Sequence, residues 1–233
     1  MWSFQQFTEH CADALALALP ISCAGCDVPD RNLCQGCRSS LVSELQYREL
    51  FDAESLERLP LWFAMEFGEP LSGVLHRFKE QGRTSLAKPL AMPLRDAMKA
   101  SYDTVLKNSP AGHISWVVPP SSRASFRQRG YSPIALLATK VGVRPERLLR
   151  INRRKADQSQ LGRMQRFTNM RGVYRAVPAT QGKRIILVDD VLTTGATLLE
   201  CARALRAGGA EVLGAAVLAY TPKNFQDTRR ENA

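Results

Sequence analysis

The chain has 233 residues, 45% of them hydrophobic, so it can bury a sizeable core and exceeds the usual size of one domain. Its formal net charge is +10, and the apolar run at residues 14–19 is too short to span a bilayer and lacks the basic flank of a signal peptide. These features argue against a membrane-inserted or exported protein and predict a soluble, cytoplasmic one.

The positive charge is concentrated in one part of the chain. Residues 123–184 contain 16 Lys and Arg but only two acids, Glu146 and Asp157, so this segment carries +14 and the rest of the chain −4. Such an excess favours a polyanionic partner, such as phosphate, pyrophosphate or nucleic acid. A solvated basic face is the simpler alternative.

The N-terminal part of the chain predicts a helix at residues 2–19, followed by a cysteine-rich module. Two C-x2-C pairs lie within fifteen residues, which is typical of metal ligation in a reducing compartment. They can supply four thiolates to one tetrahedral Zn2+, which would be structural because no coordination position stays open. A redox pair or disulfides are the alternatives. The four candidate ligands are Cys23, Cys26, Cys34 and Cys37.

Strands and helices alternate in the remainder of the chain. Residues 39–69 carry no chemistry that we can interpret, and helices at 71–78 and 86–98 flank a polar turn. The pattern then predicts strands at 113–118, 185–188 and 212–220, and helices at 133–141 and 197–207. This alternation indicates an α/β fold with a parallel sheet. We expect three parts: a module at 1–45, the α/β domain at 46–222 and a charged tail at 223–233.

The most informative stretch is residues 185–197, where an apolar strand leads into a loop rich in threonine and then into a helix. Ligands of parallel sheets bind at the carboxyl ends of strands. Free N–H groups of the loop and the positive end of the helix would form a phosphate site. The residues concerned are Thr193, Thr194, Gly195, Ala196 and Thr197, which we call the candidate phosphate loop.

Two acids, Asp189 and Asp190, precede this loop. Adjacent residues of a strand face opposite ways, so we expect one carboxylate to face the ligand squarely. A carboxylate suits a ribose diol, and either acid could hold Mg2+ through water. Phosphate beside a diol indicates a ribose 5-phosphate. In the simpler alternative the acids cap the helix and the threonines fill a turn.

Two arginine-rich loops accompany the candidate phosphate loop. Arg123, Arg127 and Arg129 follow the strand at 113–118, and we expect them to form a second loop at the same sheet edge, placed to neutralise pyrophosphate. Residues 157–174 are polar and arginine-rich and are interpreted as a lid that excludes water from the sugar. Surface solvation is the alternative for each arginine taken singly.

The order of these parts resembles the ComF family, and the resemblance covers almost the whole chain. It rests on the C-x2-C pair after Leu19-Pro20, the second pair, Leu75-His76-Arg77-Phe78-Lys79 with Gly82 and Arg83, Arg127-Gln128-Arg129-Gly130-Tyr131, Asp157-Gln158-Ser159-Gln160-Leu161 with Arg166 and Asn169, and the candidate phosphate loop. The chain departs from the family at Pro120-Ser121, where the family often has His, and at Ser132-Pro133, where it often has Asn-Gln.

The resemblance implies a type I phosphoribosyltransferase-like fold with an N-terminal zinc module, linked in naturally transformable bacteria to incoming single-stranded DNA. It implies that Asp189 and Asp190 bind the ribose, and that residues 193–197 hold its 5-phosphate. Phosphoribosyl pyrophosphate with Mg2+ would be the ligand. The positions that match the family in the pyrophosphate loop and lid are Lys79, Arg129, Gln158, Arg166 and Asn169.

Three functions remain open from the sequence. An enzyme would displace pyrophosphate from carbon 1 of the ribose by a nitrogen nucleophile, with Asp189, Asp190 and Arg129 as the catalytic candidates. A non-catalytic module would bind single-stranded DNA through its basic loops, although few aromatic residues are available there to stack on bases. A zinc-nucleated interaction protein would explain the cysteines but leave the acids unexplained.

Overall fold

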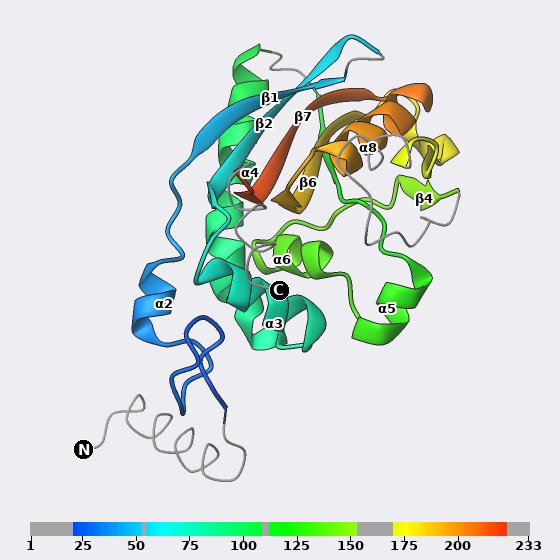
Figure 1. Ribbon diagram of the computed structural model, residues 1–233. Coiled ribbons are helices and arrows are strands. Elements are labelled where there is room, and N and C mark those ends of the chain that lie inside the picture. Colours follow the sequence, from blue (N-terminus) through cyan, green and yellow to red (C-terminus); the bar gives the residue numbers. More distant parts are fainter. Residues whose placement is uncertain (1–20, 53–54, 109–111, 153–169, 223–233) are drawn as a thin grey trace, which may run out of the picture.

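The computed structural model describes residues 21–52, 55–108, 112–152 and 170–222 (Figure 1). The helix expected at residues 2–19, the tail at 223–233 and most of the expected lid lie outside these residues. Among the described residues, no helix combines the length and the apolar character that crossing a membrane would need.

A five-stranded sheet forms the centre of the molecule, with strand order β1-β2-β7-β6-β3. Strands β2, β7, β6 and β3 are parallel, whereas β1 pairs antiparallel with β2 at one edge. The predicted α/β fold is therefore confirmed, with an antiparallel edge strand added. The bounds are β1 (Gln46–Asp52), β2 (Glu57–Glu66), β3 (Ile114–Val117), β6 (Arg184–Leu192) and β7 (Glu211–Tyr220). A separate antiparallel pair joins β4 (Leu149–Ile151) and β5 (Tyr174–Ala176).

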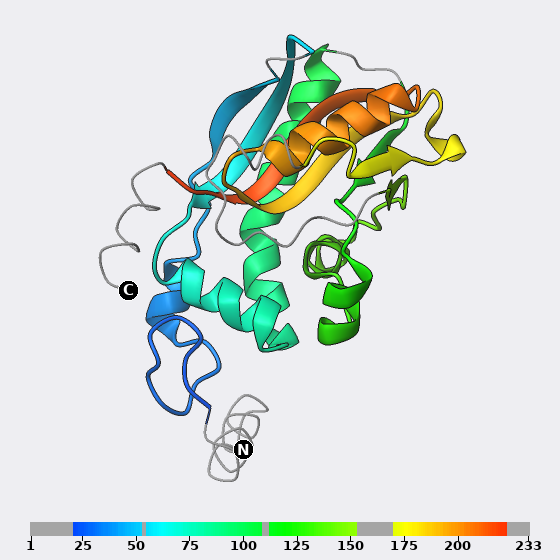
Figure 2. The ribbon, with the colours of Figure 1, turned by 45° about the vertical axis from the view of Figure 1, so that its right-hand side comes forward.

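Helices cover both faces of this sheet. On one face lie α3 (Leu71–Glu80), α4 (Ala87–Asn108) and α6 (Pro133–Lys140), and on the other lies α8 (Ala196–Ala207) (Figures 1 and 2). Strand β6 shows why its run of apolar residues is continuous. Val188 packs with the α4 side, and Ile185 and Leu187 pack with the α8 side, so both faces of the strand are buried. Short helices complete the fold: α2 (Gln35–Ser39), α5 (Arg123–Arg129), and 3-10 turns at Thr84–Leu86 and Pro178–Thr180.

Two sequence predictions need correction, and one segment without a prediction can now be assigned. Residues 39–69, which we could not interpret, contain β1 and β2. The arginine-rich segment expected as a loop forms α5, because Ser122 caps its N-terminus and Gly130 ends it in the left-handed conformation, with φ of 76°. Strand β6 continues to Leu192, so the two acids lie inside the strand and do not follow its end.

Residues 21–39, the cysteine module, pack directly against α3 (Figure 2). Arg77 of α3 donates a hydrogen bond of 2.9 Å to the carbonyl of Ala24 and pairs with Asp27. Arg83, just beyond α3, donates to the carbonyl of Ser22 at 2.7 Å. The module and α3 are therefore held together by charged and backbone groups as well as by apolar packing.

Candidate functional site

The candidate phosphate loop lies where β6 passes into α8. It surrounds a hollow of about 30 Å³ that is lined by Asp189 and by residues 191–198. Within the described part of the chain, no hydrogen bond is donated by the backbone N–H groups of Thr193, Thr194 or Gly195. The hydroxyl of Thr194 accepts a hydrogen bond of 3.3 Å from the N–H of Ala196. The loop thus combines open donors with the positive end of a twelve-residue helix.

Gly195 is required by the conformation of this loop. Its φ is +78°, a left-handed conformation that side chains rarely adopt. A Cβ atom at this position would also lie 2.8 Å from Cδ1 of Leu50 in β1. The edge strand that the sequence did not reveal therefore packs against the loop, and Leu50 is a residue of the site that we did not predict.

The two acids face opposite sides of the sheet. Asp190 forms an ion pair of 2.7 Å with Lys79 of α3, and both side chains are largely buried. Asp189 lies toward α8, since its charge helps to raise the pKa of Tyr174 and of Cys201, effects that come mainly from burial. The N–H of Asp190 donates to the carboxylate of Asp189 at 2.9 Å. This arrangement is the one expected for neighbours in a strand.

The carboxyl end of α3 links this strand to α5. Next to Lys79, Glu80 forms an ion pair of 2.6 Å with Arg129. The hydroxyl of Tyr131 donates to the carbonyl of Phe78, one residue before Lys79. The Nε of Arg129 is buried without a hydrogen-bond partner among the described residues. Helix α3 therefore contacts Asp190 through Lys79 and Arg129 through Glu80, and the sequence did not suggest a role for Glu80.

The other basic candidates are placed differently. Arg123 and Arg127 are exposed on α5, one helical turn apart, and make no contact with the acids among the described residues. Gln158, Arg166 and Asn169 lie outside the described residues, so the lid remains a prediction.

The four cysteines of the two C-x2-C pairs converge on one point. Their Sγ atoms all lie within 4.8 Å of one another, and those of Cys26 and Cys34 are 3.7 Å apart. A tetrahedral Zn2+ with Zn–S bonds of about 2.3 Å would place its sulfurs roughly 3.8 Å apart. This spacing is far longer than a disulfide bond, so the disulfide alternative does not fit. The cluster could hold a metal ion.

Backbone donors favour a thiolate at Cys23. Although burial raises the pKa of Cys23, hydrogen bonds from the N–H groups of Cys34, Gly25 and Cys26 lower it to about 6. The bond from Cys34 is 3.2 Å long. Burial and the neighbouring thiols raise the pKa of Cys37. Gly25 lies so close to Cys37 that a Cβ atom would be 2.6 Å from its Sγ, which explains the glycine in the first knuckle.

The chain is similar to several known proteins. Residues 124–230 match the phosphoribosyl transferase domain family. The chain is 28% identical over 222 residues to "Competence protein F" of Haemophilus influenzae, covering 87% of this chain and 91% of the relative. It is 30% identical over 166 residues to "DNA utilization protein YhgH" of Salmonella typhimurium, covering 66% and 71% respectively. The crystal structure of adenine phosphoribosyltransferase from Saccharomyces cerevisiae has a TM-score of 0.31 at 15% identity, covering 79% and 88%.

The domain match, together with the strand order and the loop between β6 and α8, defines a phosphoribosyltransferase-type α/β protein with an N-terminal cysteine cluster. The chain belongs to the ComF family, as the order of its sequence motifs predicted.

Proposed function

We propose that this protein binds a 5-phosphoribosyl group, that of phosphoribosyl pyrophosphate. The observation that carries the proposal is the loop at residues 193–197, whose first three N–H groups have no partner among the described residues, at the start of α8 and beside an acid pair. The loop would hold the 5-phosphate, and Asp189 or Asp190 would accept hydrogen bonds from the ribose diol. Mg2+, held through water by an acid, would offset charge on the pyrophosphate.

The ion pair between Lys79 and Asp190 indicates how the ligand would enter. Both groups are engaged with each other in the protein alone. A diol that binds Asp190 would release the ammonium of Lys79, which could then bind a ligand phosphate. Arg129 would keep its ion pair with Glu80 during this exchange. Binding would therefore replace the Lys79–Asp190 ion pair by two contacts with the ligand, one from Asp190 to the diol and one from Lys79 to a phosphate.

The same arrangement supports a transferase reaction. The bond from carbon 1 of the ribose to pyrophosphate would break, a nitrogen of the acceptor would bond to carbon 1, and pyrophosphate would leave with the electron pair. The protein would contribute positive charge and positioning without a nucleophile of its own. Release of pyrophosphate in the presence of free bases is the measurement that separates transfer from binding alone.

We also propose that the cysteine cluster holds structural Zn2+. Four thiols with the spacing of a tetrahedral site, one of them with a lowered pKa, fit this ion. The ion would fix the module on α3 and, through α3, the position of Lys79. Metal analysis of the purified protein should give one Zn2+ per chain, lost when Cys26 and Cys34 are both replaced by Ser.

Isothermal calorimetry tests the ribose proposal. The wild-type protein should bind phosphoribosyl pyrophosphate only with Mg2+ present. Asp190→Asn should weaken binding about tenfold or more, because a charge-assisted hydrogen bond contributes roughly 1.5–3 kcal/mol. Asp103→Asn is the matched control, since Asp103 pairs with Lys99 on the exposed side of α4. Absence of binding heat in the wild type would contradict the proposal, and equal affinity in the two variants would assign the diol to Asp189 instead of Asp190.

A second candidate is a DNA-handling module that binds single-stranded DNA through its basic segments. Helix α5 favours it, because Arg123 and Arg127 are exposed and Phe126, which lies between them, is 49% exposed. Cations beside an accessible aromatic ring suit a single strand. The relatives named for competence and DNA utilization point the same way.

Fluorescence anisotropy with a labelled single strand tests this candidate. Replacing both Arg123 and Arg127 by Ala should weaken binding and lower the salt dependence of log K by roughly 0.7 for each phosphate that the protein no longer neutralises. The matched control replaces Arg150 and Arg175, which are exposed cross-strand partners in β4 and β5. If both double variants bind like the wild type, or if both weaken binding equally, α5 is not the DNA surface.

A further inference from the structure

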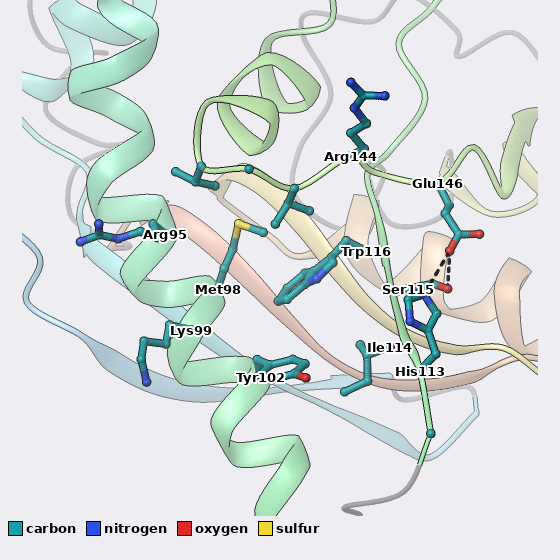
Figure 3. A pocket seen from close by; sticks show the side chains of 14 residues that line it. Arg95, Met98, Lys99, Tyr102, His113, Ile114, Ser115, Trp116, Arg144 and Glu146 are labelled. Atoms are coloured by element: carbon teal, nitrogen blue, oxygen red, sulfur yellow. Dashed lines mark hydrogen bonds and ion pairs between the residues drawn. The ribbon is translucent and has the colours of Figure 1, made fainter.

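A second cavity, of 570 Å³, lies beside β3, the edge strand of the sheet (Figure 3). It opens between α4 and the segment at residues 141–146. Its lining includes Gly112 and His113, which precede β3, so it extends toward the amino end of this parallel strand. The candidate phosphate loop follows the carboxyl end of β6, and no residue lines both hollows. The cavity is therefore a separate site.

The floor of this cavity is aromatic and apolar. Trp116 projects into it between Met98 and Tyr102 (Figure 3). The rings of Tyr102 and Trp116 are stacked, with centroids 6.2 Å apart and an angle of 27° between their planes. Tyr102 is 37% exposed, so a ligand can contact its ring although it also packs against Trp116. An accessible aromatic ring beside a tryptophan favours a planar ligand.

The rim of the cavity carries positive charge. Arg95 and Lys99 lie on α4, and Arg144 lies on the opposite side (Figure 3). Within the described part of the chain, Arg144 has no ion pair or hydrogen bond from its side chain. Arg95 and Lys99 pair only with exposed neighbours on the same helix, and such pairs contribute little and can be exchanged.

The one acid in the lining, Glu146, is already engaged. It accepts a hydrogen bond of 2.6 Å from Ser115 and forms an ion pair of 2.8 Å with Lys183. Its charge is therefore balanced inside the protein. An anionic group near Arg144 would meet net attraction.

We propose that this cavity binds a nucleotide, with the base on the Tyr102–Trp116 floor and the phosphate near Arg144. A planar ring system joined to an anionic group is the ligand that an aromatic floor and a cationic rim recognise together. The volume is sufficient for one nucleotide unit. Ring stacking does not discriminate strongly among bases, so the site would accept several of them.

Fluorescence of Trp116 gives a direct test. The chain has three tryptophans, and replacing Trp2 and Trp62 by Phe leaves Trp116 as the sole emitter. Deoxyadenosine monophosphate should quench this emission, and ribose 5-phosphate, which has no base, should not. A short oligodeoxyadenylate shows whether the unit is also accepted within a strand. Calorimetry with the same nucleotide on the chain that keeps all three tryptophans checks that the replacements do not create the signal.

Variants locate the ligand in the cavity. Tyr102→Ala should weaken nucleotide binding about tenfold, as expected for loss of one stacking ring. Arg144→Glu should weaken it by a similar factor, whereas Lys107→Glu, the same charge change at an exposed end of α4, should not. Asp190→Asn should leave this binding intact, which separates it from the phosphoribosyl site.

Each outcome decides for or against the proposal. Quenching by deoxyadenosine monophosphate supports a nucleotide site, and the result with the oligonucleotide shows whether a nucleotide within a strand is also accepted. No quenching by either, equal quenching by ribose 5-phosphate, or quenching that survives both Tyr102→Ala and Arg144→Glu would overturn it.

Discussion

Gly195 shows how a single residue depends on a part of the chain far away in sequence. Its positive φ is required for the turn into α8, and Leu50 of β1 lies against it. The need for a glycine in the turn can be predicted from the sequence, because a threonine-rich loop leads directly into a helix. The contact with Leu50 cannot, because β1 is an edge strand with mostly exposed residues and gives no apolar alternation.

Replacing Gly195 by Ala should separate these two effects. The left-handed conformation costs a non-glycine residue roughly 1–2 kcal/mol. The clash with Leu50 adds to this cost, so Gly195→Ala should lower the free energy of unfolding and weaken phosphoribosyl pyrophosphate binding. Adding Leu50→Ala should restore part of the loss but not the share due to φ. Urea unfolding and calorimetry measure the two quantities.

Gly36→Ala is the control for this series, since no atom lies within 4 Å of its added Cβ and its φ is not positive. It should change neither stability nor ligand binding by much. If Gly195→Ala behaves like Gly36→Ala, the loop conformation is not what the site requires.

Glu146 gives a pH-dependent prediction at the same scale. Hydrogen bonds from Lys183 and Ser115 lower its pKa below the ordinary value of 4.5. A lowered pKa in the folded state stabilises the protein above the ordinary pKa, and this stabilisation is lost as pH falls through the lowered value. Glu146→Gln should therefore lower the melting temperature near neutral pH, and its gap to the wild type should close in acid.

The control for this series is Glu211→Gln. Glu211 is 61% exposed, and its ion pair with Arg184 is longer, at 3.4 Å, than the pair of Glu146 with Lys183. Its gap should be small at every pH. A gap for Glu146→Gln that stays constant from neutral to acid pH would show that the carboxylate does not contribute through its ionised form.

Among the elements, α3 carries the contacts that join the cysteine module to the candidate site. Arg77 faces the module, Lys79 pairs with Asp190, and Glu80 pairs with Arg129. The sequence predicted this helix, and the family resemblance assigned Lys79 to the site. It did not predict that the same helix would also dock the cysteine module. The docking uses backbone carbonyls and an ion pair between residues far apart in sequence, and no local side-chain pattern reveals either.

Removal of the metal should therefore destabilise α3. Chelation of the zinc-loaded protein should speed amide hydrogen exchange in Leu71–Glu80, because the module would no longer hold the helix. Arg77→Met should produce part of the same change with the metal in place. Arg95→Met, which removes an exposed arginine from α4, is the matched control.

Exchange in α3 that is unchanged by chelation would contradict this coupling. Faster exchange confined to residues 21–39 would also contradict it, because the module would then be destabilised without any effect on α3.

Prediction at the level of elements succeeded where burial imposes a pattern. Strands β6 and β7 and helix α8 were found because their apolar residues are continuous or regularly spaced. Strand β2 was missed although Leu59, Leu61 and Phe63 alternate on one buried face. Pro60 interrupts that pattern, and a proline normally argues against a strand that pairs on both sides.

At the scale of the whole molecule, the two ends of the sheet carry different candidate sites. The carboxyl end of β6 carries the acids and the candidate phosphate loop, and this could be predicted because strand, acids and loop are contiguous in sequence. The cavity toward the amino end of β3 could not be predicted. Tyr102, Trp116 and Arg144 come from separate elements, and only the fold brings them to one hollow.

The position of β2 in the sheet has a consequence for how the chain is made. Its outer partner, β1, directly precedes it, but its inner partner, β7, is the last strand of the sheet. During synthesis β2 is made long before residues 211–220, so its inner edge has no partner strand until β7 has been synthesised. Such long-range pairing slows folding and leaves an apolar strand open to other chains in the meantime. The inner edge of β2 can therefore be paired only after β7 has been made, so completion of the sheet is a late step of folding.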